Sequence, residues 1–214
     1  MTKIEKGDVL ILDLTGKIAA DGTVFETTNE NIAKQAGIWS AEFSYKPKVV
    51  IAKSGMMLAG LEEEIEKMEV GEEKEFKIGY DKAFGPRDQN LLRVISLKEF
   101  KKVNVEPTEG MVVSLDGILA VVKSVNSGRV ILDFNHPMAG KDLIYKIKLI
   151  DVIKDPERKC QVLAKEFDAE IEILHNDQNQ KPQIIIKKID QKKLQVFLAI
   201  LKIAIDDWAS IKSS

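Results

Sequence analysis

Residues 9–26 read Val-Leu-Ile-Leu-Asp-Leu-Thr-Gly-Lys-Ile-Ala-Ala-Asp-Gly-Thr-Val-Phe-Glu. The first seven of them, Val9 to Thr15, are mostly apolar and predict a strand. Asp21-Gly22 predicts a tight turn, because such a turn needs a positive φ that glycine adopts without steric cost. Thr23 to Glu26 then predicts the returning strand, so this stretch indicates a β-hairpin.

The rest of the first 85 residues predicts short helices and strands in turn. Leu61, Ile65 and Met68 recur at helical spacing, and Gly71 is predicted to end that helix. The other predicted elements of this segment are a short helix over residues 30–36 and strands over residues 49–52 and 73–78.

A more uniformly β-rich pattern follows. Residues 112–125 predict two strands broken at Asp116-Gly117, and a polar turn at residues 126–128 leads into a third strand over residues 130–134. These strands indicate a small meander. Residues 143–153, Leu-Ile-Tyr-Lys-Ile-Lys-Leu-Ile-Asp-Val-Ile, predict a long strand that is buried on at least one face.

Asp155-Pro156 is the best candidate for a linker, and the chain behind it predicts helix, strand, strand and helix. Asp190 is placed to cap the last helix, which we expect to run from about Gln191 to Ile211. The other elements expected here are a helix that ends at Phe167 and a hairpin of residues 171–174 and 183–188 around a polar turn at residues 176–182.

The final predicted helix is apolar around most of its circumference, whereas a surface helix needs one apolar stripe. Phe197, Leu201 and Trp208 are among the apolar residues of this helix that must be buried against another surface. A homodimer through the C-terminal domain would bury such a face in two copies at once. Docking of the helix onto the rest of the same chain is the alternative.

Composition narrows the classes of function. The 214 residues carry 32 Lys and Arg against 34 Asp and Glu, a net charge of -2, which argues against a nucleic-acid binder. One cysteine, Cys160, excludes an internal disulfide and fits a reducing compartment. With only His136 and His175 as histidines, no metal site is expected. No apolar segment is long enough for a signal peptide or a membrane span, so we expect a cytoplasmic protein that does not bind membranes.

Common catalytic motifs are missing from the sequence. It contains no phosphate-binding glycine loop, no H-E-x-x-H and no C-x-x-C. An enzyme with this sequence is therefore expected to work without a nucleophile, a metal or any other cofactor.

Five motifs, in order, carry a resemblance to a known family. Residues 14–16 with 21–26 resemble the Y-T-G…D-G-x-x-F-D opening of FKBP-type peptidyl-prolyl isomerases. Residues 57–62, Met-Leu-Ala-Gly-Leu-Glu, resemble the V-I-x-G-[WL]-E helix start of that family, and residues 68–72 its M-x-V-G-[DE] motif. Residues 80–85 are similar to the A-Y-G pocket motif of the family. Residues 135–143, Asn-His-Pro-Met-Ala-Gly-Lys-Asp-Leu, are similar to the N-H-P-L-A-G-x-x-L signature of the SlyD-like branch.

The resemblance implies an α+β fold with an FKBP-like antiparallel sheet wrapped on a helix. In the SlyD-like branch a module is inserted in the flap of this domain, and the β-rich segment lies where that module is expected. We therefore expect an isomerase domain from residues 1–85 and 135–153, an inserted chaperone module at 86–134, and a C-terminal α+β domain at 154–214, as in the long archaeal members.

The family also implies a site. The residues that match its catalytic pocket are Phe25, Glu26, Met57, Leu58, Leu61, Phe84 and Tyr145. Substrate contacts are expected from Leu14, Val50, Ala83, His136 and Met138, and client contacts on the module from apolar residues that include Leu91, Leu92, Val94, Ile95, Met111 and Val113. Residue type alone favours a core role for Phe25, Phe84 and Tyr145, and about half of the module residues are expected in the module's own core.

Such a pocket would act on peptide bonds before proline in unfolded or partly folded proteins and in prolyl peptides. An apolar environment favours the twisted amide of the transition state, which gives up less hydration than the planar amide. The sequence departs from the family at Leu14 and Phe84, where tyrosines are usual, and at Glu26 and Leu61, which replace aspartate and tryptophan. A holdase chaperone with a weak or vestigial isomerase pocket is therefore the alternative function.

Overall fold

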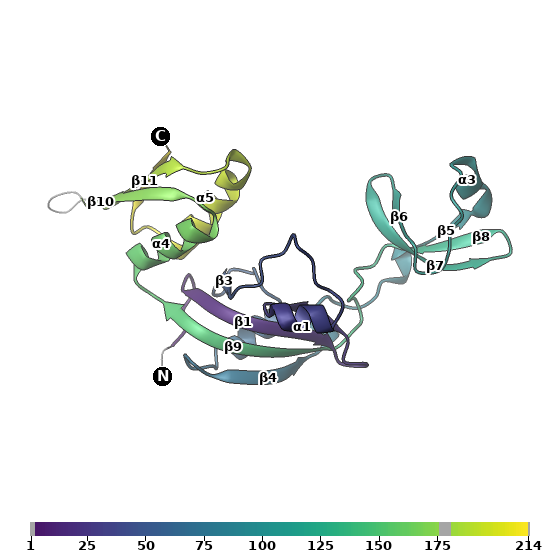
Figure 1. The fold of residues 1–214 in the computed structure, drawn as a ribbon, viewed down its shortest axis with the longest axis horizontal. Coiled ribbons are helices and arrows are strands. Elements are labelled where there is room, and N and C mark those ends of the chain that lie inside the picture. The colour runs from purple at the N-terminus through teal and green to yellow at the C-terminus, as the bar shows by residue number, and fades with distance from the viewer. Residues whose placement is uncertain (1–2, 176–180, 214) are drawn as a thin grey trace. The chain divides into compact units, whose positions relative to one another are not determined.

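The structure, a computed structural model, describes residues 3–175 and 181–213 (Figure 1). It divides into two compact units. One unit holds the residues up to Gly79 and those from Asp142 onward, and the other holds Tyr80–Lys141. Both units combine helices with mainly antiparallel sheets, as expected for an α+β protein.

Five antiparallel strands form the main sheet of the first unit. In its centre, β1 (Val9–Ile18) pairs with β9 (Leu143–Ile153) from end to end. β4 (Glu73–Ile78) adds to the other edge of β9, while the short strands β2 (Val24–Thr27) and β3 (Lys48–Ile51) share the outer edge of β1. The alternation of β9 buries every second side chain on one face, as expected for a half-buried strand.

The hairpin predicted from the opening stretch is present as β1 and β2. Gly22 has a φ of +73°, and its N–H donates to the carbonyl of Ile18 at 2.9 Å. The carboxylate of Asp21 accepts from the N–H of Thr23 at 2.9 Å and closes the turn. Local turn chemistry therefore fixes the register that places Glu26 opposite Gly16.

Two helices accompany the main sheet. α1 (Glu30–Gln35) lies where the sequence predicted a short helix, and it is capped by Asn29 and followed by Gly37 at φ +70°. α2 (Ala59–Ile65) buries Leu61 and Ile65, which confirms the helical spacing, but it ends six residues before Gly71. Beyond Ile65 the chain continues in tight turns that still bury Met68, so the apolar spacing outlasts the helix.

The second unit contains a four-stranded antiparallel sheet in the order β5-β8-β7-β6. β6 (Val112–Leu115) and β7 (Ile118–Asn126) meet at Asp116-Gly117, as predicted, and β8 (Arg129–Asp133) follows the predicted turn. The sequence interpretation missed β5 (Leu92–Ser96) and the helix α3 (Leu97–Lys102), which begins at a Ser96 cap. Two short 3₁₀ helices, Tyr80–Lys82 and Gln89–Leu91, precede β5.

Polar contacts join the two chain segments that enter and leave this sheet. The amide of Asn135 accepts from the N–H of Asp88 at 2.8 Å and donates to the Asp88 carbonyl at 2.9 Å. Arg87 pairs with the buried carboxylate of Asp133, and that carboxylate also accepts from Asn135. The segments at the two ends of the insertion are thus held side by side.

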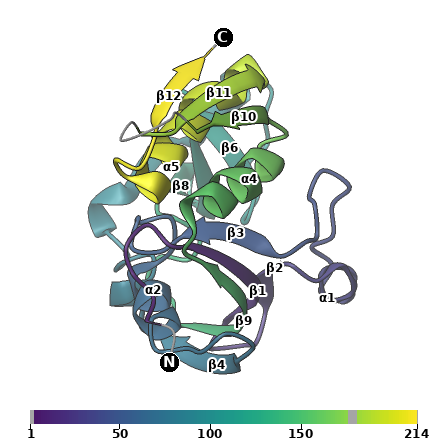
Figure 2. The ribbon, with the colours of Figure 1, turned by 90° about the vertical axis from the view of Figure 1, so that its left-hand side faces the viewer.

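The C-terminal domain contains α4 (Pro156–Glu166), β10 (Glu170–Leu174), β11 (Gln183–Lys188) and α5 (Gln191–Ile205) (Figure 2). The predicted hairpin is present, although most of its predicted turn, residues 176–180, lies outside the described residues. The expectation of a final helix to Ile211 was wrong. The helix ends where Asp206 adopts a φ of +49°, and β12 (Ser210–Ser213) pairs in parallel with β11.

The same domain packs on the main sheet through a shared apolar core. Val9 and Ile51 of the sheet are fully buried in one cluster with Cys160 of α4 and with Phe197 and Leu201 of α5. Docking within the chain thus covers two of the residues for which the sequence predicted a partner. Val196 and Ile203 of α5 remain exposed, and the homodimer stays a prediction.

A buried ion pair accompanies this apolar contact. The side chain of Lys159 is 9% exposed, lies 3.5 Å from the carboxylate of Asp8 and donates to the Ala204 carbonyl at 3.1 Å. Gly7, at φ +85°, brings the chain so close that a Cβ there would lie 2.9 Å from the carbonyl oxygen of Ile203. α4 and α5 are therefore held against the start of β1 by both apolar and polar contacts.

Candidate functional site

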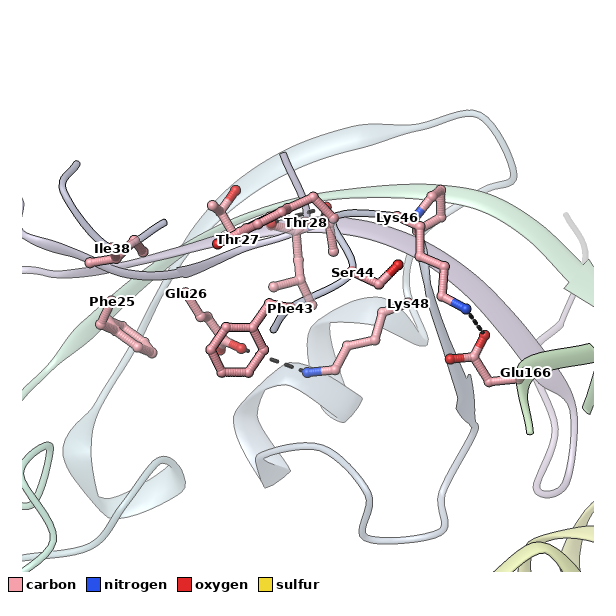
Figure 3. A pocket seen from close by; sticks show the side chains of 13 residues that line it. Phe25, Glu26, Thr27, Thr28, Ile38, Phe43, Ser44, Lys46, Lys48 and Glu166 are labelled. Atoms are coloured by element: carbon pink, nitrogen blue, oxygen red, sulfur yellow. Dashed lines mark hydrogen bonds and ion pairs between the residues drawn. The ribbon is translucent and has the colours of Figure 1, made fainter. Parts of the chain in front are cut away.

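A cavity of about 380 Å³ opens beside β1 and β2 of the first unit (Figure 3). Its wall is formed by the end of the β1–β2 hairpin, by the loop that precedes β3, and by the last residue of α4. The residues that line it include Leu14, Phe25, Glu26, Phe43, Lys46, Lys48 and Glu166.

The aromatic wall of this cavity is built from two strands. Phe25 of β2 lines it, and Tyr145 of β9 backs Phe25 with its ring edge-on, at 5.8 Å between centroids and 87° between planes. Gly16 of β1 lies between them, paired with Glu26 on one side and Tyr145 on the other. Because Gly16 has no side chain, the two rings can meet across the central strand.

We expect Gly16→Ala to disturb the aromatic wall directly. The new Cβ would lie 2.8 Å from Cζ of Phe25 and 2.9 Å from Cε1 of Tyr145, so at least one ring must move. Overpacking of this kind costs about 1–3 kcal/mol, which thermal or urea unfolding would detect. A variant that unfolds with the wild-type midpoint would show that the rings are not held as described.

The carboxylate of Glu26 is engaged on both oxygens. Oε1 accepts the hydroxyl hydrogen of Tyr145, and Oε2 lies 3.6 Å from Nζ of Lys48. Burial, and then the negative charge and the hydrogen bond of Glu26, raise the pKa of Tyr145 well above its usual range. Tyr145 therefore remains a neutral donor to Glu26 at physiological pH, and this network orients side chains rather than transferring a proton.

The other predicted residues of the first unit are distributed differently. Leu14 lines the cavity, and its role as a substrate contact stays a prediction. Val50 and Leu61 are buried in the domain core, and Leu58 precedes the first residue of α2. Met57 lines a separate cavity of about 10 Å³ under α2. The structure thus brings Leu14, Phe25 and Glu26 together in the cavity wall, with Tyr145 behind them.

Four predicted site residues belong to the second unit. Phe84 and His136 stack with nearly parallel rings, 4.2 Å between centroids and 7° between planes. Nδ1 of His136 accepts from the N–H of Met138 at 3.1 Å, which fixes the direction of the imidazole. Ala83 and Met138 are half-buried. Two motifs far apart in the sequence therefore meet, and the contribution of these residues to a substrate pocket stays a prediction.

The predicted client residues of the insertion fall into two groups. Ile95, Met111 and Val113 pack against the sheet core formed by Ala120, Val122, Val130 and Leu132. Leu91 and Val94 are exposed, and Leu92 is half-buried. Further exposed apolar residues, which the sequence interpretation did not select, are Val103, Val112, Ile118 and Leu119.

Several residues of the cavity were also missed. Phe43 precedes β3 and Lys48 is its first residue, whereas the sequence interpretation predicted only a strand over residues 49–52 in this part of the chain. The aromatic density of that loop, with Trp39, Phe43 and Tyr45, was a usable signal. Glu166 had no local signal, because it reaches the cavity only through the docking of its domain.

The part of the chain that the structure describes contains neither a metal-binding cluster nor a membrane-spanning helix. Between residues 3 and 175 and between 181 and 213, no group of three or more His, Cys, Asp or Glu side chains is placed to hold a metal ion. Within the same ranges, no helix is long and apolar enough to cross a membrane.

The cavity has an aromatic wall and belongs to a sheet that carries an inserted second unit. These features are typical of a site that binds an apolar ligand. A family model described as the FKBP26 IF domain matches residues 93–138. The short-type peptidyl-prolyl cis-trans isomerase of Methanocaldococcus jannaschii is 40% identical over 149 residues, which cover 70% of this chain and 94% of that protein. The chain therefore belongs to the FKBP-type peptidyl-prolyl cis-trans isomerase family.

Other similar proteins are more distant. The FKBP-type isomerase SlyD of Helicobacter pylori is 25% identical over 135 residues, or 62% of this chain and 72% of that protein. The FKBP-type 16 kDa isomerase of Escherichia coli is 25% identical over 154 residues, or 70% and 93%. A solved structure of the three FKBP domains of wheat FKBP73 matches 72% of this chain and 42% of its own at 17% identity, with a TM-score of 0.38.

Proposed function

We propose that this chain accelerates cis–trans isomerisation of peptide bonds before proline in unfolded or partly folded proteins, and that the cavity beside β1 and β2 receives the proline. One observation carries the proposal: Phe25, backed edge-on by Tyr145, forms an apolar wall of a cavity of about 380 Å³. A cavity of that size accommodates a proline ring and its neighbouring peptide groups.

Cis–trans isomerisation of a peptide bond requires no proton transfer or nucleophile from the side chains. Rotation about the peptide bond must break amide resonance against a barrier of roughly 18–20 kcal/mol. The twisted amide has lost much of its charge separation, so it gives up less hydration than the planar amide when it enters an apolar site. A dry cavity therefore stabilises the transition state more than the ground state, which is the condition for catalysis.

The charged residues of the cavity are consistent with this mechanism. Glu26 is paired with both Tyr145 and Lys48, so it brings no unpaired carboxylate to the substrate. Phe43 is 68% exposed in the loop before β3 and offers a second apolar surface at the cavity. We infer that Phe25 and Phe43 contact the prolyl residue from two sides.

We further propose that the inserted unit holds client chains. It exposes the apolar residues Leu91, Val94, Val112, Ile118 and Leu119. Weak binding there would raise the local concentration of prolines at the cavity without tight binding in it. The same residues support the second candidate, a holdase chaperone that binds clients and leaves proline isomerisation unchanged.

Refolding of a protein whose slow phase is limited by proline isomerisation separates the two candidates. We expect catalytic amounts of the chain to shorten that phase roughly tenfold or more, from an uncatalysed time of tens to hundreds of seconds. The control is an equal concentration of a holdase without isomerase activity, which reduces aggregation alone. Suppressed aggregation with an unchanged slow phase would reject the isomerase and favour the holdase.

A further inference from the structure

The C-terminal domain contributes a residue to the cavity of the isomerase domain. Glu166, the last residue of α4, lines the same cavity as Phe25. Its Oε2 accepts from Nζ of Lys46 at 2.8 Å, and Figure 3 shows the two side chains reaching toward each other at one side of the cavity. No feature of the pocket motifs in the sequence points to this residue.

The position of Glu166 is fixed by the fold rather than by a flexible tail. Only two residues separate the end of β9 from the start of α4, and the carboxylate of Asp155 caps the helix by accepting from the N–H of Arg158 at 2.8 Å. Cys160 and Leu163 of α4 are buried against the main sheet, and Lys159 pairs with Asp8. Glu166 is therefore carried on a helix that is anchored to the isomerase domain.

The loop before β3 is tied to α1 near its start, where Nε1 of Trp39 donates to Oε1 of Glu30 at 3.2 Å and the N–H of Ile38 donates to the Ala33 carbonyl at 3.0 Å. Within the loop, the Tyr45 hydroxyl accepts from the N–H of Ser40 at 2.9 Å, and the Ser40 hydroxyl accepts from the N–H of Glu42 at 3.2 Å. These contacts shape the loop but do not join it to another element. The Lys46–Glu166 pair joins it to α4, next to the cavity residue Phe43.

Charge is balanced around the cavity by two such pairs. Lys48 lies beside Glu26 and Lys46 beside Glu166, so the two lysines and two glutamates in the wall sum to zero. Asp168, which is also close to Lys46, is itself paired with Lys193 at 2.7 Å. Loss of Glu166 would leave the Lys46 ammonium without its closest counter-ion at the edge of the cavity.

We propose that Glu166 determines the substrate specificity of the prolyl site by neutralising Lys46, so that the cavity accepts either charge beside the proline. The inference rests on the proposed function of the cavity. It predicts that reversal of Glu166 turns a charge-tolerant site into one that prefers peptides with an acidic residue next to proline and disfavours basic ones.

The experiment measures kcat/KM for prolyl peptides that carry Glu, Ala or Lys immediately before or after the proline. In Glu166→Lys we expect the ratio of Glu to Lys peptides to rise about fivefold over wild type for at least one of the two positions, the size expected for a partly exposed charge pair. The double reversal Lys46→Glu with Glu166→Lys should return the ratio to the wild-type value. In 1 M salt, where the Debye length is about 3 Å, the difference should shrink.

A matched control lies on the same domain. Glu172 of β10 pairs with Lys187 of β11 at 2.6 Å and does not line the cavity, so Glu172→Lys changes the net charge by the same amount at another place. It should leave the ratio unchanged. Should Glu166→Lys not fold, Glu166→Gln tests the same point with about half the effect on a logarithmic scale.

The outcomes separate this inference from the proposed function. A wild-type chain that catalyses none of the peptides refutes the proposed function itself. Catalysis with the same Glu-to-Lys ratio in wild type, Glu166→Gln and Glu166→Lys refutes the role of Glu166 alone. An equal change in Glu172→Lys also refutes it, because net charge would then account for the effect.

Discussion

Replacing Phe25 with alanine is expected to lower kcat/KM for a prolyl peptide about 30-fold. The substitution removes the ring that lines the cavity and leaves Tyr145 without its edge-on partner. The enlarged site admits water, and the loss of about 2 kcal/mol of differential stabilisation corresponds to that factor. A protease-coupled or NMR exchange assay on a short prolyl peptide measures it.

Two further variants make this result specific. Tyr145→Phe keeps the ring and loses only the hydrogen bond to Glu26, so we expect a loss of roughly threefold, typical of one hydrogen bond. Cys160→Ala should keep wild-type turnover, because Cys160 is buried in the C-terminal core and its environment raises the thiol pKa to about 12. An inactive Cys160→Ala with an active Phe25→Ala would contradict the proposed mechanism.

Excision of the inserted unit should affect the turnover of a short peptide and the catalysis of protein refolding differently. We expect replacement of residues 87–133 by a linker of roughly six glycine and serine residues to leave a folded domain, because contacts such as Gly140 N–H to the Gly85 carbonyl, 2.8 Å, hold the remaining ends together. The cut removes Arg87 and Asp133 together, so no buried charge is left unpaired.

Turnover of a short peptide by the excised chain should stay within about threefold of wild type, whereas catalysis of protein refolding should fall at least tenfold with the loss of local client concentration. Circular dichroism and thermal unfolding confirm that the shortened chain is folded. An equal loss on peptide and protein would mean that the insertion supports the cavity and does not hold clients.

Local signals in the sequence predicted the parts of the fold that local chemistry determines. Asp21-Gly22 gave the hairpin because its turn requires a positive φ, and Asp116-Gly117 gave the β6–β7 turn for the same reason. Periodicity was less reliable at element ends. Met68 continues the apolar spacing of α2 beyond its last turn, and Ile211 continues that of α5 although it lies in a strand.

The parts of the site that depend on contacts distant in sequence were harder to predict. The resemblance to the family pointed to Phe25 and Tyr145, but the role of Gly16 becomes visible only when its two neighbouring strands are known. Glu166 reaches the cavity through the docking of α4 and α5, which depends on the buried contacts of Phe197 and Leu201. No local pattern encodes such a contact.

The measurement that tests the central claim most directly is an NMR titration of the full chain with a prolyl peptide, with side-chain aromatic and methyl signals assigned. The account predicts that the signals of Phe25, Tyr145 and Leu14 shift in a saturable way, and that intermolecular NOEs join the proline ring to Phe25. Saturable binding with NOEs only to the inserted unit, and unchanged Phe25 and Tyr145 signals, would contradict the assignment of this cavity as the prolyl site.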